Sequence, residues 1–377
     1  MKIKYAISNE IYRHNSSSQK NKMKFSGLSF DVIKILSLGF FSFIVAILLS
    51  KPLISFLYKY KLWRKQVRTK AIDGGDVPYF QKFHSEGEVK IPRFGGILIF
   101  ATTIILVFLF FLLDNLFNIQ IFNKLNFLSR SQTWLPLFAL VAASLLGLTD
   151  DLLQVFSKGK YIGGGLSLVY RLSLVAVIGI IGALWFYFKL DWHTIHIPGI
   201  GNLEIDGLYI PLFIITMMAV YSGGVIDGID GLAGGVFAII FAGYAVIAIF
   251  LRQIDLASFL SVILGSLLAF LWHNIPPAKF YMGETGILGL TATLTVVAFL
   301  TDSVLVLPII GLVLFAESGS VILQLLSKKF RGKKLFLAAP IHHHFEAKGW
   351  PAPQVTMRFW LITMVAMMVG VIIRLFG

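Results

Sequence analysis

Four short polar stretches interrupt an otherwise apolar chain, and their side chains are of types that bind cations and phosphates. They are Asp150-Asp151, the glycine-rich run 222–235 with Asp227 and Asp230, the run 272–286 with Glu284, and the run 340–353 with three consecutive histidines. Carboxylates in an apolar setting are costly to desolvate, so they usually hold a cation or move a proton. Carboxylate oxygens suit a hard cation such as Mg²⁺. The four stretches together predict phosphate chemistry supported by Mg²⁺.

The aspartates are the first candidates for catalysis. Adjacent carboxylates such as Asp150 and Asp151 raise one another's pKa, which suits one of them to act as a base. The plainer interpretation is a pair of aspartates at a helix end in headgroup water. Asp227 and Asp230 are three residues apart and would share one side of a helical turn. The glycines around them let the backbone approach a ligand closely, whereas a simple interhelical turn would not explain both acids.

The histidine run is expected to be a loop in water or in a wet cleft, because hydrocarbon cannot accommodate it. His342, His343 and His344 cannot all face one way on a helix, so at most two of them would converge on one ligand. A histidine-rich soluble connector is the alternative interpretation. Tyr281, in the neighbouring polar stretch, is either a stacking partner for a nucleobase or an aromatic anchor at the membrane interface.

These stretches are positioned by long apolar segments. Hydrophobic residues make up 57% of the 377 residues and the mean hydropathy is +0.81, which is above the globular range. The apolar segments have the length that crosses a bilayer as a helix. We expect ten, at 34–58, 95–118, 134–149, 167–188, 208–222, 234–250, 257–273, 286–301, 303–326 and 355–376. The predicted fold is an all-α polytopic membrane protein with about ten transmembrane helices.

The N-terminal tail, the net charge and the cysteine count give three further constraints. Residues 1–33 are polar and basic and are expected to form a disordered tail before a transmembrane domain at 34–377. The net charge of +14 is typical of basic loops beside anionic lipid, and nothing else in the sequence supports nucleic-acid binding. The absence of cysteine excludes disulfides, thiolate metal sites and a catalytic thiol.

Charge bias predicts the orientation. Most lysines and arginines between segments lie in the loops after odd-numbered segments, so those loops are expected in the cytoplasm and both termini outside. All four polar stretches then fall on the cytoplasmic face, which predicts a single active site there. On the outer side, residues 193–199 are expected to form a small β-hairpin. Pro308 is expected to kink the ninth segment.

The run from Pro340 to Glu346, continued by Lys348–Pro351, resembles the signature of the phospho-N-acetylmuramoyl-pentapeptide transferases. The stretches Glu317–Gln324 and Arg358–Trp360 extend this resemblance, which covers roughly residues 34–377. The other three polar stretches are similar to motifs of the wider superfamily of polyprenyl-phosphate N-acetylhexosamine-1-phosphate transferases.

The resemblance implies transfer of phospho-MurNAc-pentapeptide from UDP-MurNAc-pentapeptide to undecaprenyl phosphate. The products would be lipid I and UMP, with Mg²⁺ as cofactor. It also implies a multi-pass protein of the bacterial inner (cytoplasmic) membrane, in contact with membrane lipid and present as a homodimer. One-step transfer with Asp150 as the base and two-step transfer through an enzyme carboxylate both stay open.

By the same resemblance, individual residues take expected roles. The catalytic residues would be Asp150, Asp151, Asp227 and His343, and the metal ligands Glu284 and Asp227. The substrate-binding residues would be Lys90, Gly228, Ile229, Asp230, Asn274, Tyr281, Gln324, His342 and His344.

The sequence also departs from the family pattern, which suggests a divergent member. Glu284 stands where the family usually has Asp, and Tyr221 and Gly224 stand where it usually has Asn. Gln154 replaces a lysine after the aspartate pair, for which Lys158 or Lys160 would substitute. The motif at 90–96 is closer to the GlcNAc-1-phosphate branch, so a UDP-GlcNAc transferase for surface polysaccharide is the alternative. A transporter is a more distant one, because its ionisable residues would lie at mid-membrane and its halves would repeat.

Overall fold

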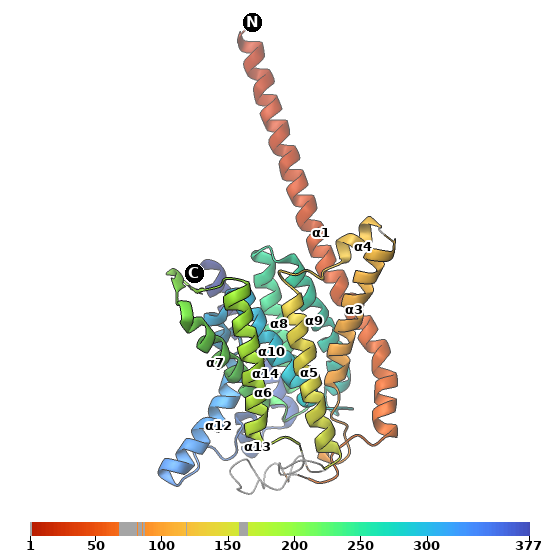
Figure 1. Ribbon diagram of the computed structural model, residues 1–377, viewed down its shortest axis with the longest axis vertical. Helices are drawn as coiled ribbons and strands as arrows, with labels where there is room; N and C mark the ends of the chain where they lie inside the picture. The colour runs from red at the N-terminus through yellow and green to blue at the C-terminus, as the bar shows by residue number, and fades with distance from the viewer. Residues whose placement is uncertain (1, 68–80, 82–84, 86, 118, 158–164) are drawn as a thin grey trace.

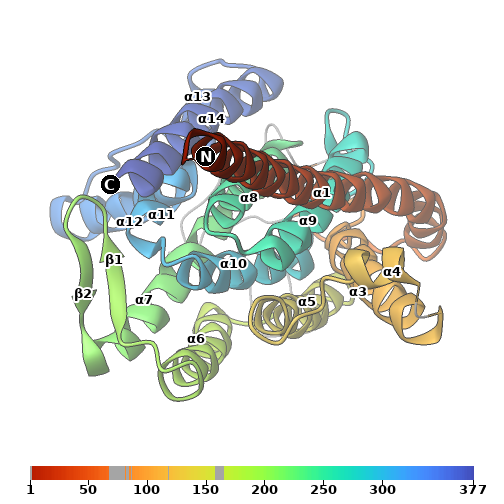
Figure 2. The same ribbon diagram turned by 90° about the horizontal axis from the view of Figure 1, so that it is seen from above.

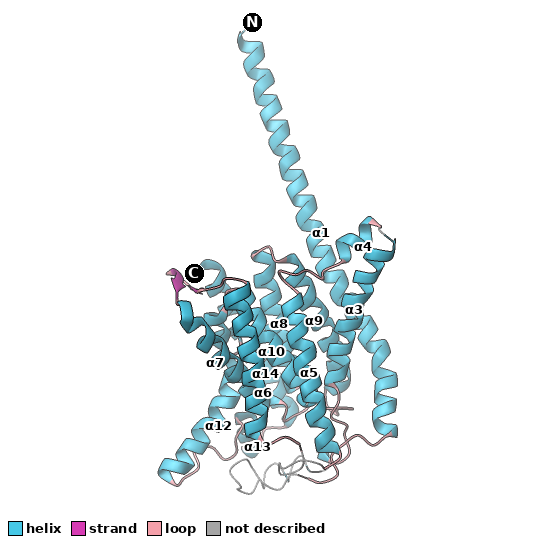
Figure 3. Cartoon of the chain, in the orientation of Figure 1, coloured by secondary structure: helices cyan, strands magenta, loops and turns pink. Residues whose placement is uncertain are grey.

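The computed structural model describes residues 2–67, 81, 85, 87–117, 119–157 and 165–377, with side chains described from Phe30 onward. Within these ranges the chain is almost entirely helical, and Figure 3 shows two short strands at one end of the helical bundle. The all-α fold class is therefore confirmed.

Nine described helices are long and apolar enough to cross a bilayer, and a bent pair supplies a tenth span. Seven of the nine are Phe30–Lys59 within α1 (Lys2–Lys59), α3 (Gly96–Phe117), α5 (Trp134–Val155), α8 (Leu232–Phe250), α9 (Ile254–Asn274), α10 (Gly283–Leu300) and α14 (Ala352–Phe376). The other two are Leu168–Lys189, which joins α6 (Leu168–Leu184) to η1 (Trp185–Lys189), and Asp206–Ile226, which joins η2 (Asp206–Leu208), α7 (Tyr209–Ser222) and η3 (Gly223–Ile226). Each predicted apolar segment coincides with one of these ten spans, which Figure 1 shows as one bundle.

The bent pair corrects one expectation. It joins Val304–Ile310, which contains η4 (Val304–Val306) and α11 (Leu307–Ile310), to α12 (Leu312–Arg331) at an angle of 79°. The break falls at Gly311 and not at Pro308. Pro308 lies in the first turn of α11, where its missing N–H costs no hydrogen bond, so it does not kink the helix. Beyond the break, α12 leans away from the bundle in Figure 1.

The short elements connect the spans. They are α4 (Gln120–Leu125), β1 (Thr194–Ile197), β2 (Gly201–Glu204) and α13 (Ile341–Ala347). The strands pair antiparallel with Thr194 opposite Glu204 and Ile197 opposite Gly201. This confirms a hairpin, although its second strand lies beyond the predicted range 193–199. The histidine run, expected as a loop, forms the helix α13.

The N-terminal segment also differs from the expectation. Where composition suggested a disordered tail, α1 continues as helix from Lys2. The stretch contains no proline and a single glycine, Gly27, so nothing in it terminates a helix that begins in the membrane. Both termini lie at the same end of the bundle in Figure 1, as an even number of spans requires. Which end faces the cytoplasm stays a prediction.

Helix α10 lies at the centre of the bundle (Figure 2), and 94% of its spanning window is buried. Small residues permit this packing. A Cβ on Gly147 of α5 would lie 2.1 Å from the Glu284 carbonyl oxygen, and one on Gly96 of α3 would lie 2.2 Å from the Gly286 nitrogen. Neighbouring helices therefore approach α10 backbone to backbone, as small residues allow in membranes. The N-terminal end of α10 is where the polar stretches meet.

Candidate active site

The first turn of α10 holds two aspartates from distant parts of the chain. The first N–H groups of a helix have no partner within it. Here Gly283 N donates to Asp227 Oδ2 at 3.1 Å, Glu284 N to Asp151 Oδ1 at 3.0 Å, and Thr285 N to Asp151 Oδ2 at 2.8 Å. Thr285 Oγ1 donates to the same Asp151 oxygen at 2.7 Å. The helix dipole favours negative charge at this end, so both carboxylates are stabilised there.

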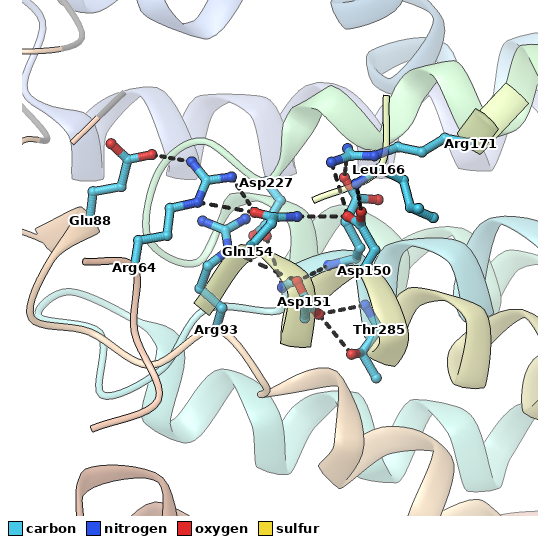
Figure 4. A network of polar contacts seen from close by, with 12 residues as sticks. Arg64, Glu88, Arg93, Asp150, Asp151, Gln154, Leu166, Arg171, Asp227 and Thr285 are labelled. Carbon is cyan, nitrogen blue, oxygen red and sulfur yellow. Dashed lines mark hydrogen bonds and ion pairs between the residues drawn. The ribbon is translucent and has the colours of Figure 1, made fainter. Parts of the chain in front are cut away.

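Asp150 and Glu284 meet through an arginine. Figure 4 shows Arg171 of α6 pointing at the Asp150 carboxylate, with Nη2 2.9 Å from Oδ2. Arg171 Nη1 lies 2.5 Å from Glu284 Oε1. Asp150 also accepts from Leu166 N at 2.6 Å and from Gln154 Nε2 at 2.7 Å. Its side chain is 1% exposed, so the charge is buried but has partners on both oxygens.

A second arginine comes from the first polar loop. Arg93 Nε lies 4.0 Å from Asp151 Oδ1. The loop is fixed by backbone hydrogen bonds to the segment before α10, from Tyr281 N to Pro92 O and from Gly95 N to Tyr281 O, both at 2.8 Å. The motif at 90–96 is thereby part of the site. Four carboxylates, Asp150, Asp151, Asp227 and Glu284, and two arginines gather at one end of the bundle.

Burial changes the acid–base properties of this group. Burial raises the pKa of Asp227, while Arg93 and the Gly283 N–H lower it and Glu284 raises it further; the net change is upward. Burial lowers the pKa of Arg93, but attraction to Asp151, Asp227 and other acids outweighs that and raises it overall, so Arg93 stays charged. Burial also raises the pKa of Tyr281, whose phenol stays protonated.

The glycine-rich turn is held against the segment before α10. Asn274 Oδ1 accepts from Gly231 N at 3.0 Å, and Asn274 Nδ2 donates to Phe280 O at 2.9 Å. Asp230 Oδ2 accepts from Ala278 N at 2.9 Å. The turn that carries Asp227, Gly228 and Ile229 is fixed in this way. Asn274, expected to bind substrate, uses its amide for this backbone clamp.

Two of the three histidines face the glycine-rich turn. A Cβ on Gly228 would lie 2.3 Å from His342 Nε2 and 3.3 Å from His343 Nε2. His342 Nδ1 is 2.9 Å from Glu317 Oε2, with both side chains fully buried, and His343 Nδ1 is 2.6 Å from Glu346 Oε2. His342 Nε2 is buried and makes no hydrogen bond within the described residues. This geometry agrees with the expectation that at most two of the three histidines would converge on one ligand.

The remaining expected ligands lie differently. His344 Nδ1 accepts from Leu337 N at 3.1 Å. Gln324 Oε1 accepts from Leu335 N and Phe336 N, each at 2.9 Å. These two side chains therefore fix the loop after α12. Lys90 is exposed in the loop that carries Arg93. Lys158 and Lys160 lie outside the described residues.

Sequence reasoning missed the roles of Arg171, Thr285 and Arg64, whose guanidinium contacts Gln154. One signal was available for Arg171, because it is the only charged residue in the apolar segment 167–188. An ionisable residue in such a segment usually faces a partner inside the bundle. Thr285 and Arg64 carry no comparable signal, since a threonine in a helix and an arginine in a basic loop are ordinary.

The carboxylates fit a metal ion that is shared with a substrate. Within the described ranges, no three His, Asp or Glu side chains form a complete metal cage. Mg²⁺ is usually held by one or two carboxylates together with substrate phosphates and water. Asp227 and Glu284 supply two half-buried carboxylates at one helix end, which matches that pattern.

A cavity of about 420 Å³ lies elsewhere, at the end of the bundle that carries the hairpin. Among its lining residues are His193, Gln253, Asp302 and Arg374, and none of the four carboxylates is among them. This cavity is therefore separate from the carboxylate group.

Comparison with known proteins shows the family to which the chain belongs. The family model described as glycosyl transferase family 4 matches residues 133–302, which hold the aspartates, the glycine-rich turn and Glu284. A phospho-N-acetylmuramoyl-pentapeptide transferase of Levilactobacillus brevis is 39% identical over 63% of this chain and 73% of the relative. One of Chloroflexus aurantiacus is 34% identical over 76% and 78%, and one of Caldanaerobacter subterraneus 33% over 89% and 98%. The chain belongs to the phospho-N-acetylmuramoyl-pentapeptide transferase family, as a multi-pass membrane protein.

Replacing Thr285 by valine tests the clamp at α10. The variant loses a buried hydrogen bond to a carboxylate, so the free energy of unfolding should fall by about 2 kcal/mol. Thr291→Val is the matched control, because Thr291 Oγ1 donates to carbonyls of its own helix. Thermal melting of both variants in detergent measures the difference. Equal melting temperatures for the two variants would contradict the clamp.

Proposed function

We propose that the chain transfers phospho-MurNAc-pentapeptide from UDP-MurNAc-pentapeptide to undecaprenyl phosphate, releasing UMP and forming lipid I. Family membership supports this reaction. The observation that carries it is the meeting of Asp150, Asp151, Asp227 and Glu284 with Arg93 and Arg171 at one end of a membrane bundle. Buried cations beside carboxylates suit a site that must accept both a diphosphate and a lipid phosphate.

Mg²⁺ is the proposed cofactor, with Asp227 and Glu284 as its protein ligands. When bound, it would offset negative charge on the diphosphate. The chain contributes charge of its own, because Arg93 stays protonated and Arg171 lies between two acids. Glu284 is fixed in direction by Arg171, so its oxygens do not have to be ordered when substrate arrives.

We assign the two adjacent aspartates different roles. Asp151 accepts three hydrogen bonds from the first turn of α10, which supports a positioning role. Asp150 would accept the proton of the lipid phosphate. A phosphate oxygen then attacks the sugar-linked phosphorus of the donor, the bond to UMP breaks, and UMP leaves. This is a one-step transfer.

The histidine helix would close over the donor. His342 and His343 face Gly228, next to Asp227, and His342 Nε2 is a buried group suited to a substrate hydrogen bond. The site would face the cytoplasm, where a UDP-linked donor is available, and the membrane would be the bacterial cytoplasmic membrane. Homodimer formation stays a prediction.

Release of UMP by detergent-purified protein tests the proposal directly. Protein, Mg²⁺ and undecaprenyl phosphate are incubated with UDP-MurNAc-pentapeptide or with UDP-GlcNAc. We expect UMP with the pentapeptide donor only. Release with UDP-GlcNAc alone would move the protein to the polysaccharide branch, which the form of the motif at 90–96 favours.

Replacing Glu284 by glutamine tests the metal site. The Mg²⁺ concentration for half-maximal UMP release should rise about tenfold, because an amide oxygen is a weaker ligand for a hard cation. Glu204→Gln, in strand β2 at the opposite end of the bundle, is the matched control and should leave the titration unchanged. An unchanged titration for Glu284→Gln would mean that the metal is held elsewhere.

A further inference from the structure

A buried arginine, Arg64, contacts the carboxylate group indirectly, through the side chain of Gln154. Arg64 follows the end of α1, and its residue is 3% exposed. Its Nη1 donates to Glu88 Oε1, and both side chains are 4% exposed. Its Nε donates to Gln154 Oε1 at 3.0 Å, and Nη2 donates to the same oxygen. Burying such a pair is costly, and its partners must be well placed to offset that cost.

The contact with Gln154 determines which way the amide of that residue points. A guanidinium has only donors, so it must face the amide oxygen. The amide nitrogen is then directed the opposite way, and Gln154 Nε2 donates to Asp150 Oδ2 at 2.7 Å. Turning the amide over would set its NH₂ group against Arg64 and its oxygen against the Asp150 carboxylate. Figure 4 shows the three side chains in line, with Glu88 beyond Arg64.

We propose that Arg64 is a positioning residue for the transfer reaction, acting on Asp150 through Gln154. Arg64 holds the amide of Gln154 so that its NH₂ group donates to the Asp150 carboxylate. The two hydrogen bonds of this relay polarise and so strengthen one another. With Leu166 N on the other oxygen, the relay fixes the direction of the Asp150 carboxylate. The inference rests on the proposed role of Asp150 as the base.

The competing interpretation is a purely structural ion pair. Arg64 and Glu88 would then only fasten the first polar loop to the end of α1. Removing Arg64 alone cannot separate the two, because it takes a cation away from the buried Glu88 carboxylate and destabilises the fold. The double variant Arg64→Met/Glu88→Gln removes both charges together. Gln154→Met is a second route, since it breaks the relay while the Arg64–Glu88 pair stays.

A cation placed directly beside Asp150 should again hold its carboxylate in the direction that Arg64 and Gln154 impose. Gln154 lies four residues after Asp150 on α5, so a lysine there would reach the carboxylate on the same helix face. The test variant is therefore Arg64→Met/Glu88→Gln with Gln154→Lys added. Lys65→Met is the matched control, because Lys65 is an exposed cation next in the chain.

The experiment measures kcat and KM for UMP release, and the melting temperature of each variant in detergent. We expect kcat to fall about 10- to 100-fold in Arg64→Met/Glu88→Gln and in Gln154→Met, with KM changed less than about twofold. Adding Gln154→Lys to the double variant should recover about tenfold in kcat without raising the melting temperature. Lys65→Met should behave as the unmodified protein.

Two results would overturn the inference. One is an unchanged kcat in Gln154→Met, since the relay would then be dispensable. The other is a loss of kcat that follows the melting temperature and that Gln154→Lys does not recover, which would leave Arg64 a structural role only. Absence of UMP release by the unmodified protein is a different outcome, because it would remove the proposed function itself.

Discussion

The hydrogen bonds at the N-terminus of α10 are the constraint on which the site depends. Three backbone N–H groups that the helix cannot satisfy internally are satisfied by Asp151 and Asp227. In a membrane such groups are expensive to leave unpaired, and so are buried carboxylates. Here the unpaired N–H groups and the buried carboxylates satisfy one another. These hydrogen bonds tie α5 and the glycine-rich turn to α10, whose spanning window is 94% buried. Gly147 and Gly96 make the clamp possible, because side chains there would hold the neighbouring helices off.

The remaining charges are arranged around that clamp. Arg171 bridges Asp150 and Glu284, and Arg93 reaches Asp151 from the first polar loop. Interactions of this kind are stronger where water is excluded, so few groups are enough to balance several acids. The two aspartates that are adjacent in sequence consequently have different surroundings. Asp151 is bound to a helix end, whereas Asp150 contacts an arginine, an amide and a backbone N–H. Different surroundings permit different chemical roles.

Much of the fold followed from the sequence, because hydrocarbon thickness sets the length of each apolar segment. All ten segments coincide with spans, and the four polar stretches meet at one end. Helix ends were less predictable. The Asp150–Asp151 pair was taken as the end of a segment, but α5 continues to Val155, because the residues after the aspartates are again largely apolar. Which cation pairs with which acid, as in Arg171 with Asp150, depends on helix packing that no local pattern encodes.

Hydrogen exchange at the amides of Gly283, Glu284 and Thr285 tests most directly whether the aspartates hold the first turn of α10. Exchange is followed by mass spectrometry in detergent for the unmodified protein and for Asp151→Asn. The clamp predicts slow exchange at these amides, faster exchange at Glu284 and Thr285 in the variant, and no change in the distant hairpin β1–β2. Fast exchange in the unmodified protein, or equal exchange in the two proteins, would contradict it.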